Sequence, residues 1–294
     1  MTSGAVLKKC DPVAYYDEFL VNRVFPDGRD VEQYRPISIS PGVNWKHHRS
    51  VIVEHGDIVI SLTGKLSLHR DNDEPNLKFR FRNDDRSKVN SNEQNRLESI
   101  TDSLHYLAKE NVFFERSEFD TEEPAFRWNL KVTITFFSSE GFILDAVLIG
   151  LNALFAQIRI PFVRYDWLKN LEKEEQTIDT ARIIVSEKEF RRLVIKETPT
   201  FSAFGLYVSK HGAEGLTEPL LVADPPSDLA ALCASTLEFV HLSGDRIILS
   251  TVQGSLSVPP AVYSRVAAMG ASHHRNVSEA LARFAGDQRL AGDQ

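Results

Sequence analysis

The spacing of apolar side chains changes from a helical to a strand-like period within the first sixty residues. Between residues 12 and 24 apolar positions recur every three or four residues, and the preceding Asp-Pro pair is typical of a helix that begins there. A Pro-Asp-Gly turn at 26–28 ends this helix. The period then falls to two, which predicts a strand over 37–39 and a hairpin over 49–62 that turns at a His-Gly-Asp sequence.

The middle of the chain alternates between polar and strongly apolar segments. Asp, Asn, Arg, Ser and Lys dominate residues 69–95, which predicts a long polar loop. Apolar residues at helical spacing over 97–107 predict a helix, and alternation over 130–137 predicts a strand. An almost wholly apolar helix follows, and we expect it to end at Ile160-Pro161. Because it is apolar on nearly every face, we expect it to lie buried between two layers.

Charged residues dominate 165–190, and we place the boundary between two halves there. The second half predicts strands over 201–208, 220–223, 237–242 and 246–251, and then a helix over about 260–284. Each half thus has strands first and then a helix, which predicts an α+β fold built from a duplicated unit. The expected divisions are an N-terminal helix over 1–24, a first half over 25–164, a charged linker over 165–190 and a second half over 191–294.

The balance of charges limits how the chain can meet a polyanion. Its 294 residues are 42% hydrophobic and 26% charged, which is ordinary for globular proteins and excludes wholesale disorder. The formal net charge is −7, so no basic field surrounds the whole chain. Any contact with nucleic acid must therefore come from a local patch or from partner subunits.

Cysteine usage and hydropathy indicate the compartment. Only Cys10 and Cys233 occur, with no Cys-x-x-Cys and no Cys/His cluster. We therefore expect neither a disulfide framework nor a metal site, and we favour a reducing compartment. The longest apolar stretch, 142–156, is interrupted by polar residues and falls short of the ~20 apolar residues of a membrane span. We expect a soluble intracellular chain without membrane contact.

Several segments, taken in their order and spacing, resemble one protein family. They are Asp11–Leu20 with its paired tyrosines, Pro26–Arg29, Glu32–Arg35, Glu140–Val147, Ile160-Pro161, Thr200–Ala203 and Leu221–Pro225. Together they resemble the RNase PH-like ring subunits of the eukaryotic RNA exosome, over residues 11–284. The resemblance implies an RNase PH fold of two α+β halves, with a ribosomal S5 domain 2-like first half and an RNase PH second half.

The same resemblance implies a role in RNA processing. Six such subunits form a ring, and RNA is threaded through its central channel towards a separate 3'-to-5' nuclease, for rRNA maturation and mRNA turnover. The implied partners are other RNase PH-like ring subunits, cap subunits with OB-fold and KH domains, the nuclease and single-stranded RNA. The implied locations are the nucleus, nucleolus and cytoplasm, and no cofactor is implied.

Active members of the family cleave RNA with inorganic phosphate, which needs an anion site at a helix N-terminus and an acid near the leaving oxygen. Where active relatives carry Gly-Gly-Thr/Ser-Arg, this chain has Glu140-Gly141-Phe142-Ile143. A carboxylate and two bulky apolar side chains repel or exclude phosphate. The Asp of active relatives falls at Ser235, whose hydroxyl is no acid near neutral pH. We therefore expect a non-catalytic subunit, and the alternative is an active phosphate-dependent 3'-to-5' exoribonuclease.

The polar stretch contains the best local candidate for an RNA contact. Its cations are interleaved with Phe79 and Phe81, and cations that neutralise phosphates beside rings that stack on bases fit single-stranded RNA. Carboxylates in the same stretch cancel its net charge, so a solvated charged surface is an equal alternative. The residues predicted to bind RNA are Arg80, Arg82, Arg86 and Lys88.

For several other polar residues, the sequence favours a structural role over a chemical one. Asp224 and Asp228 flank a Pro-Pro loop at four-residue spacing, which favours a helix cap and turn over acid/base or metal chemistry. Adjacent histidines, His47-His48 and His273-His274, point in different directions, so we expect them on a solvated surface rather than in a metal site. In Asp27-Gly28-Arg29 we expect a type I turn with Arg29 paired to a carboxylate.

Overall fold

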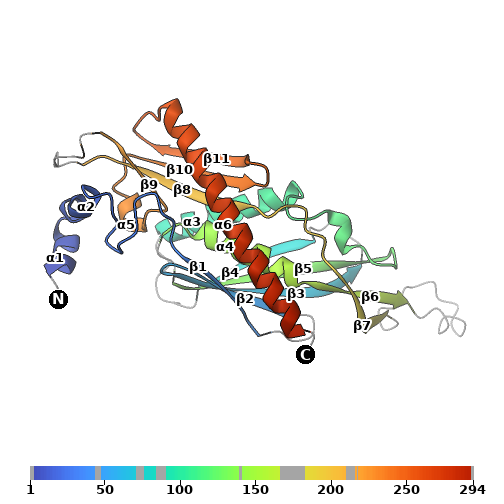
Figure 1. The fold of residues 1–294 in the computed structure, drawn as a ribbon. Coiled ribbons are helices and arrows are strands. Elements are labelled where there is room, and N and C mark those ends of the chain that lie inside the picture. The colour runs from blue at the N-terminus through green and yellow to red at the C-terminus, as the bar shows by residue number, and fades with distance from the viewer. Residues whose placement is uncertain are drawn as a thin grey trace, which may run out of the picture.

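Two β-sheets with helices packed against them make up most of the chain (Figure 1). The computed structural model describes residues 3–43, 48–70, 76–83, 91–138, 141–165, 183–209, 216 and 218–292. Among these residues, no helix is long and apolar enough to cross a membrane.

The first sheet has five strands. They are β1 (Ile37–Pro41), β2 (His48–His55), β3 (Ile58–Arg70), β4 (Leu77–Asn83) and β5 (Phe126–Ser138), in the spatial order β1-β2-β3-β5-β4. All neighbouring pairs are antiparallel except β4 and β5, which are parallel. The predicted hairpin over 49–62 is confirmed, because β2 and β3 pair outward from His55 and Ile58 around Gly56.

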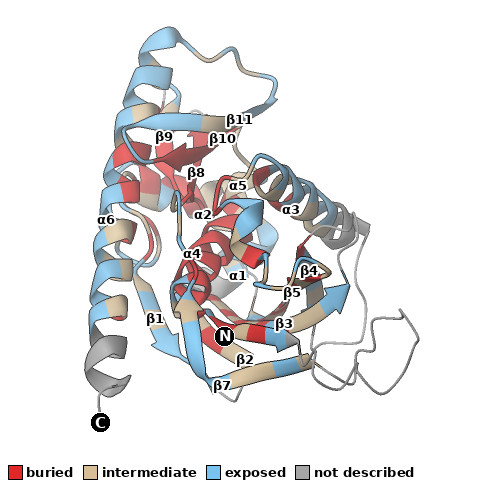
Figure 2. Ribbon diagram, turned by 90° about the vertical axis from the view of Figure 1, so that its right-hand side faces the viewer, coloured by how far each residue is buried: buried red, intermediate tan, exposed pale blue. Residues whose placement is uncertain are grey.

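The apolar helix α4 (Ile143–Gln157) occupies the centre of the molecule. Every residue from Ile143 to Phe155 is buried, and the helix packs on β2 and β3 on one side and on the second half on the other. Figure 2 shows the resulting band of buried residues in α4 and the strands around it. The expected position between two layers is confirmed, but α4 ends at Gln157, and Ile160-Pro161 belong to the next strand.

The second sheet has four strands and carries the longest helix. The strands are β8 (Thr200–Tyr207), β9 (Leu220–Ala223), β10 (Ser235–Leu242) and β11 (Arg246–Gly254), in the order β11-β10-β8-β9. The predicted strands and the predicted final helix are confirmed. That helix, α6 (Pro260–Gly292), contacts β8 and β10 of this sheet as well as α4 and β1 of the first half, so it spans both halves (Figure 1). The short helix α5 (Ser227–Ala230) follows β9.

The long polar loop predicted over 69–95 is wrong for its described residues. Strand β4 lies within it and pairs in parallel with β5, and helix α3 (Ser91–Lys109) already begins before its end. Alternation explains the strand, because Phe79 and Phe81 pack against the core while Arg80 and Arg82 are exposed. The outward positions of this strand are polar, so the composition of the segment resembles that of a loop although its residues alternate with a period of two.

The predicted charged linker also contains a strand. Strand β7 (Ile183–Arg192) pairs with β6 (Arg159–Tyr165) as an antiparallel ribbon, and residues 166–182 between them lie outside the described residues. Most of β7 is exposed or half-buried. Pairing with β6, together with the packing of Ile183 and Val185 against the core, therefore keeps this charged segment extended.

The N-terminal segment packs on the second half of the chain. The helix predicted over 12–24 is confirmed as α2 (Pro12–Leu20), although it ends four residues earlier than expected. At its start the Asp11 carboxylate accepts a hydrogen bond from the Ala14 N–H at 3.0 Å. A further helix, α1 (Ser3–Cys10), precedes it, and a 3-10 turn, η1 (Arg116–Phe119), precedes β5. Tyr16 and Leu20 form one buried cluster with residues of the second half, and its other members include Phe25, Tyr207, Val222 and Leu229.

Candidate functional site

The N-terminus of α4, at which the sequence resemblance implies a lost phosphate clamp, is occupied by protein groups. Gly141 has φ +106°, its N–H donates to Ser227 Oγ at 2.7 Å, and its carbonyl accepts from the Arg96 guanidinium. A Cβ on Gly141 would lie 2.7 Å from the guanidinium nitrogens of Arg35. Only glycine fits here, because both the backbone angle and the space exclude a side chain.

The two residues after Gly141 turn into the core. Phe142 stands at the N-cap of α4 without a side-chain cap hydrogen bond, and its ring centroid lies 6.1 Å from that of Phe201. Ile143 is buried in the main hydrophobic core. Neither side chain can donate a hydrogen bond to an anion, and Glu140 lies outside the described residues.

Ser235, which the sequence resemblance implies stands in place of a catalytic acid, is buried and hydrogen-bonded. Its Oγ lies 2.9 Å from the Ala234 carbonyl and 3.0 Å from the Leu256 carbonyl, both acceptors for its one proton, and it accepts from the Leu256 N–H at 3.0 Å. Gly254 packs so closely on the Ser235 backbone that a Cβ there would lie 2.4 Å from Ser235 Cα. The hydroxyl therefore fastens the chain after β11 to the start of β10.

Asp224 is the centre of a buried ion pair that joins the two halves. Arg35 makes a bidentate pair with the Asp224 carboxylate, in which Nε donates to Oδ2 at 2.8 Å and Nη2 donates to Oδ1 at 2.6 Å. The Arg35 backbone N–H also donates to Oδ2 at 3.1 Å. The helix-cap role predicted for Asp224 is therefore wrong: the carboxylate pairs with Arg35 over a separation of 189 residues. Asp228 lies in the first turn of α5, after its N-cap Pro226, and pairs with Lys8 at 2.6 Å.

A second carboxylate, Asp145 of α4, extends this cluster towards α6. Its Oδ2 lies 2.8 Å from His273 Nε2. The buried ring of His55 stands between the two carboxylates, with its Nε2 3.7 Å from Oδ2 of Asp145 and of Asp224. Neither ring nitrogen of His55 has a hydrogen-bond partner within the described segments. We call Arg35, His55, Asp145, Asp224 and His273 the ionic cluster.

The charges of the ionic cluster shift its pKa values in opposite directions. Burial alone would raise the pKa of Asp224, but hydrogen bonds from Arg35 and the positive charge beside it outweigh burial and lower it. Burial lowers the pKa of His55. For His273, burial acts in the same direction, but the Asp145 carboxylate outweighs it and raises the pKa. Two carboxylates thus share one cluster because an arginine and a histidine compensate them.

The expectation of a solvated surface for His273-His274 is wrong. His273 is buried, with its ring stacked on Tyr34 at a centroid distance of 3.9 Å, and His274 Nδ1 lies 3.1 Å from Thr200 Oγ1. His273 is covered by Tyr34 and Asp145 and His274 by Thr200, contacts that the mixed composition of α6 did not reveal. His48 is half-buried in β2, and His47 lies outside the described residues.

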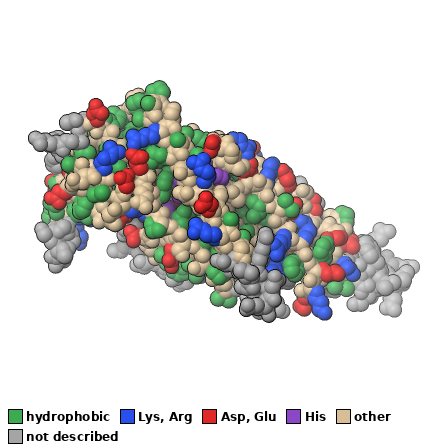
Figure 3. All heavy atoms as spheres, viewed as in Figure 1, with side chains coloured by type: hydrophobic (Ala, Val, Ile, Leu, Met, Phe, Trp, Pro, Cys, Tyr) green, Lys and Arg blue, Asp and Glu red, His purple; other side chains and the backbone are tan. Residues whose placement is uncertain are grey.

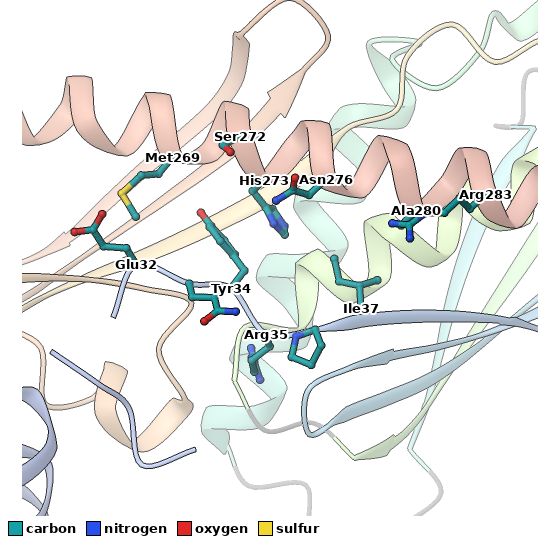
Figure 4. Close-up of a pocket in the computed structure, with 12 residues that line it drawn as sticks. Glu32, Tyr34, Arg35, Ile37, Met269, Ser272, His273, Asn276, Ala280 and Arg283 are labelled. Atoms are coloured by element: carbon teal, nitrogen blue, oxygen red, sulfur yellow. The ribbon is translucent and has the colours of Figure 1, made fainter. Parts of the chain in front are cut away.

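A cavity of about 460 Å³ opens between residues 32–37 and α6 (Figure 4). Met269, His273 and Asn276 line it from the helix, and Tyr34 lines it from the opposite side. Two of its polar side chains are already engaged, since Arg35 binds Asp224 and His273 binds Asp145. No group of three His, Cys, Asp or Glu residues that could hold a metal ion occurs in the described part of the chain.

The residues predicted to bind RNA are distributed between a strand and undescribed segments. Arg80 and Arg82 are exposed on β4, whereas Arg86 and Lys88 lie outside the described residues. Phe79 and Phe81, expected to stack on bases, instead pack against the core. The predicted pairing of Arg29 is confirmed, with Nε donating to Asp27 Oδ2 at 2.6 Å. The face of the molecule in Figure 3 mixes basic and acidic side chains, so it bears no charge of a single sign.

The fold is that of chains in exosome cores. A chain of the Archaeoglobus fulgidus exosome with RNA bound to the active site is similar with a TM-score of 0.64 and 16% identity, over 91% of this chain and 96% of that one. A chain of an archaeal exosome core has the same score and identity, over 96% and 99%. Rice (Oryza sativa) Rrp46 has a TM-score of 0.57 and 13% identity, over 89% and 100%. No family model and no curated protein sequence matches the chain.

These likenesses establish the fold class. The α+β fold expected for an RNase PH-like subunit is confirmed along nearly the whole length of both chains.

Proposed function

We propose that this chain is a non-catalytic subunit of an RNA exosome core ring, most similar to exosome component eight. The observation that carries the proposal is the closed N-terminus of α4, in a chain whose fold matches an archaeal exosome chain over 99% of that chain's length. The specific likeness to component eight rests on the tyrosine pair of α2 followed by the Pro-Asp-Gly-Arg turn.

Phosphorolysis makes chemical demands that the residues around α4 do not meet. Phosphate binding needs donors aimed outward from a helix N-terminus together with a free cation. Here Ser227 takes the Gly141 N–H, and two nearby cations are engaged, Arg35 by Asp224 and Arg96 by the Gly141 carbonyl. The acid position is Ser235, whose hydroxyl is bound to Leu256. A subunit of this kind forms part of the channel wall and catalyses no reaction.

Exposed apolar side chains support a role in assembly. On and after β7, Ile184, Phe190 and Val194 are exposed, and on β11 Ile247 and Val252 are exposed. Apolar groups on open strands are typical of surfaces that neighbouring subunits cover. The proposed partners are other RNase PH-like ring subunits, OB-fold and KH cap subunits, an associated 3'-to-5' nuclease and single-stranded RNA. The proposed locations are the nucleus, nucleolus and cytoplasm.

Two measurements test this function. Co-expression with a set of RNase PH-like ring subunits, followed by size-exclusion chromatography, should yield a ring that contains this chain. A chain that stays monomeric with every such set would contradict the assembly role. The purified chain, incubated with single-stranded RNA and inorganic phosphate, should release no nucleoside diphosphates, with an active archaeal exosome as the positive control. Phosphate-dependent release above a buffer control would instead support the alternative, an active exoribonuclease.

A further inference from the structure

Basic side chains form a row across the exposed face of the five-stranded sheet. Lys65 of β3 is directly opposite Lys131 of β5, and Lys131 is directly opposite Lys78 of β4. His48 of β2 continues the row beside Lys65. Directly opposed residues project from the same face of a sheet, with neighbouring strands ~4.8 Å apart. Three lysines therefore stand side by side on three adjacent strands.

The same face carries further cations and hydroxyl groups. On β4, Arg80 is opposite Thr133, and Arg82 is opposite Thr135. Along β3, Lys65 alternates with the buried residues Leu62, Gly64 and Leu66, so its face is the one turned away from α4. We call the exposed set the basic sheet face. Its cations are Lys65, Lys78, Arg80, Arg82 and Lys131, and all five are exposed.

This arrangement is unfavourable for the isolated fold. Like charges directly opposite each other on neighbouring strands destabilise a sheet. Within the described segments, Lys65, Lys131, Arg80 and Arg82 have no salt bridge. By contrast, Arg127 at one end of β5 is paired with Asp120 at 2.7 Å. In a chain of net charge −7, like charges gathered on one face of a sheet fit a polyanion that would relieve their repulsion.

We propose that the basic sheet face binds single-stranded RNA along its phosphate backbone, and the choice of RNA among polyanions rests on the proposed function. Lysines and arginines supply phosphate contacts, and Thr133 and Thr135 supply hydroxyl donors between them. Phe137 follows on the same side of β5 with 59% of its surface exposed, which provides a ring for base stacking. An acidic protein segment would use the charges but would need neither a stacking ring nor a flat sheet.

The experiment measures binding of a fluorescein-labelled 12-nucleotide oligouridylate to the full chain by anisotropy, between 50 and 200 mM salt. The test variant is K65Q/K131Q. The matched control is K109Q/K188Q, which removes the same charge from exposed positions in α3 and β7. Each phosphate contact on a single strand contributes about 0.7 to the salt slope, so the test variant should lose about 1.4 in slope and bind about 25-fold more weakly at 0.1 M salt. R80Q/R82Q should lose a similar amount, and the control should match the parent chain.

Three results would overturn the proposal. The parent chain could show no measurable RNA binding, the test and control variants could change equally, or the slope of K65Q/K131Q could stay unchanged. A parent chain that binds polyglutamate as tightly as oligouridylate, with both lost in K65Q/K131Q, would assign the face to an acidic protein partner instead. Ring assembly of the parent chain is measured separately by co-expression. If the parent chain joins no ring but K65Q/K131Q shows the predicted loss of slope, the proposed function is refuted and the polyanion-binding face stands.

Discussion

Replacement of Asp224 by Asn tests whether the ionic cluster holds the two halves together. The substitution keeps the shape and a similar tolerance of the left-handed backbone, which matters because Asp224 has φ +45°. It removes the charge that compensates Arg35 at 2.6 and 2.8 Å, in a side chain only 4% exposed. Removing one partner of a buried pair typically costs about 3–5 kcal/mol, because the other charge stays buried without compensation. We expect D224N to lose about 3 kcal/mol of unfolding free energy.

Urea denaturation at pH 7, followed by far-UV circular dichroism, measures this loss. The matched control is D228N, which breaks the half-exposed Lys8–Asp228 pair and should cost at most about 1 kcal/mol after solvent screening. The double variant R35M/D224N should be less destabilised than the sum of its single variants, since it leaves no buried charge unpaired. A D224N loss no larger than that of D228N would refute the reasoning.

Acid titration gives the same experiment a second readout. Because Arg35 lowers the folded-state pKa of Asp224, the pair stabilises the fold above the unfolded value of about 3.9. This contribution is lost as the pH falls through the folded-state pKa. The difference in stability between the parent chain and D224N should therefore be largest near neutral pH and shrink in strong acid. A difference that stays constant down to the lowest pH would mean that the charge of Asp224 is not the stabilising feature.

Three further substitutions test other contacts. Gly141→Ala should lower stability by about 1 to 3 kcal/mol in urea denaturation, because its φ is +106° and a Cβ would meet Arg35; an unchanged midpoint would contradict the close packing. His273→Gln should lower the free energy of unfolding more at pH 6 than at pH 9. Because the pKa of His273 is raised in the folded state, its pairing with Asp145 stabilises the fold fully below about pH 6.5, and this stabilisation is lost as the pH rises through the folded-state pKa. A loss of stability that does not depend on pH would contradict this. Lys131→Glu should raise stability by about 1 kcal/mol by turning cross-strand repulsion into attraction, while weakening RNA binding; a loss of stability would argue against repulsion there.

Local patterns were sufficient to predict most strands and helices. The hairpin over 49–62 was predictable because its residues alternate around a turn sequence, so burial on one face and turn chemistry agree. The central helix was predictable because its composition excludes an exposed position. In both cases the signal lies within about fifteen consecutive residues.

The parts that were missed depend on contacts between distant residues. Strand β4 pairs with β5, which lies roughly fifty residues further along the chain. Because β4 is rich in cations, its composition is also typical of a polar loop. Asp224 looked like a cap because Arg35, 189 residues earlier, could not be paired with it from sequence. The burial of His273 likewise depends on where α6 crosses the two sheets. The chain shows which residues are available for such clusters, but the fold determines which of them meet.

The packing of α2 on the second half has a consequence for biosynthesis. Tyr16 and Leu20 leave the ribosome early, but their contacts with Tyr207, Val222 and Leu229 cannot form until some two hundred further residues have been made. During that interval the amphipathic N-terminal helix has no native surface to cover. Folding that depends on contacts so distant in sequence is slow, and the waiting segment is open to chaperones and to aggregation. We therefore expect nascent chains stalled before residue 207 to be held by chaperones, and release to follow completion of the second sheet.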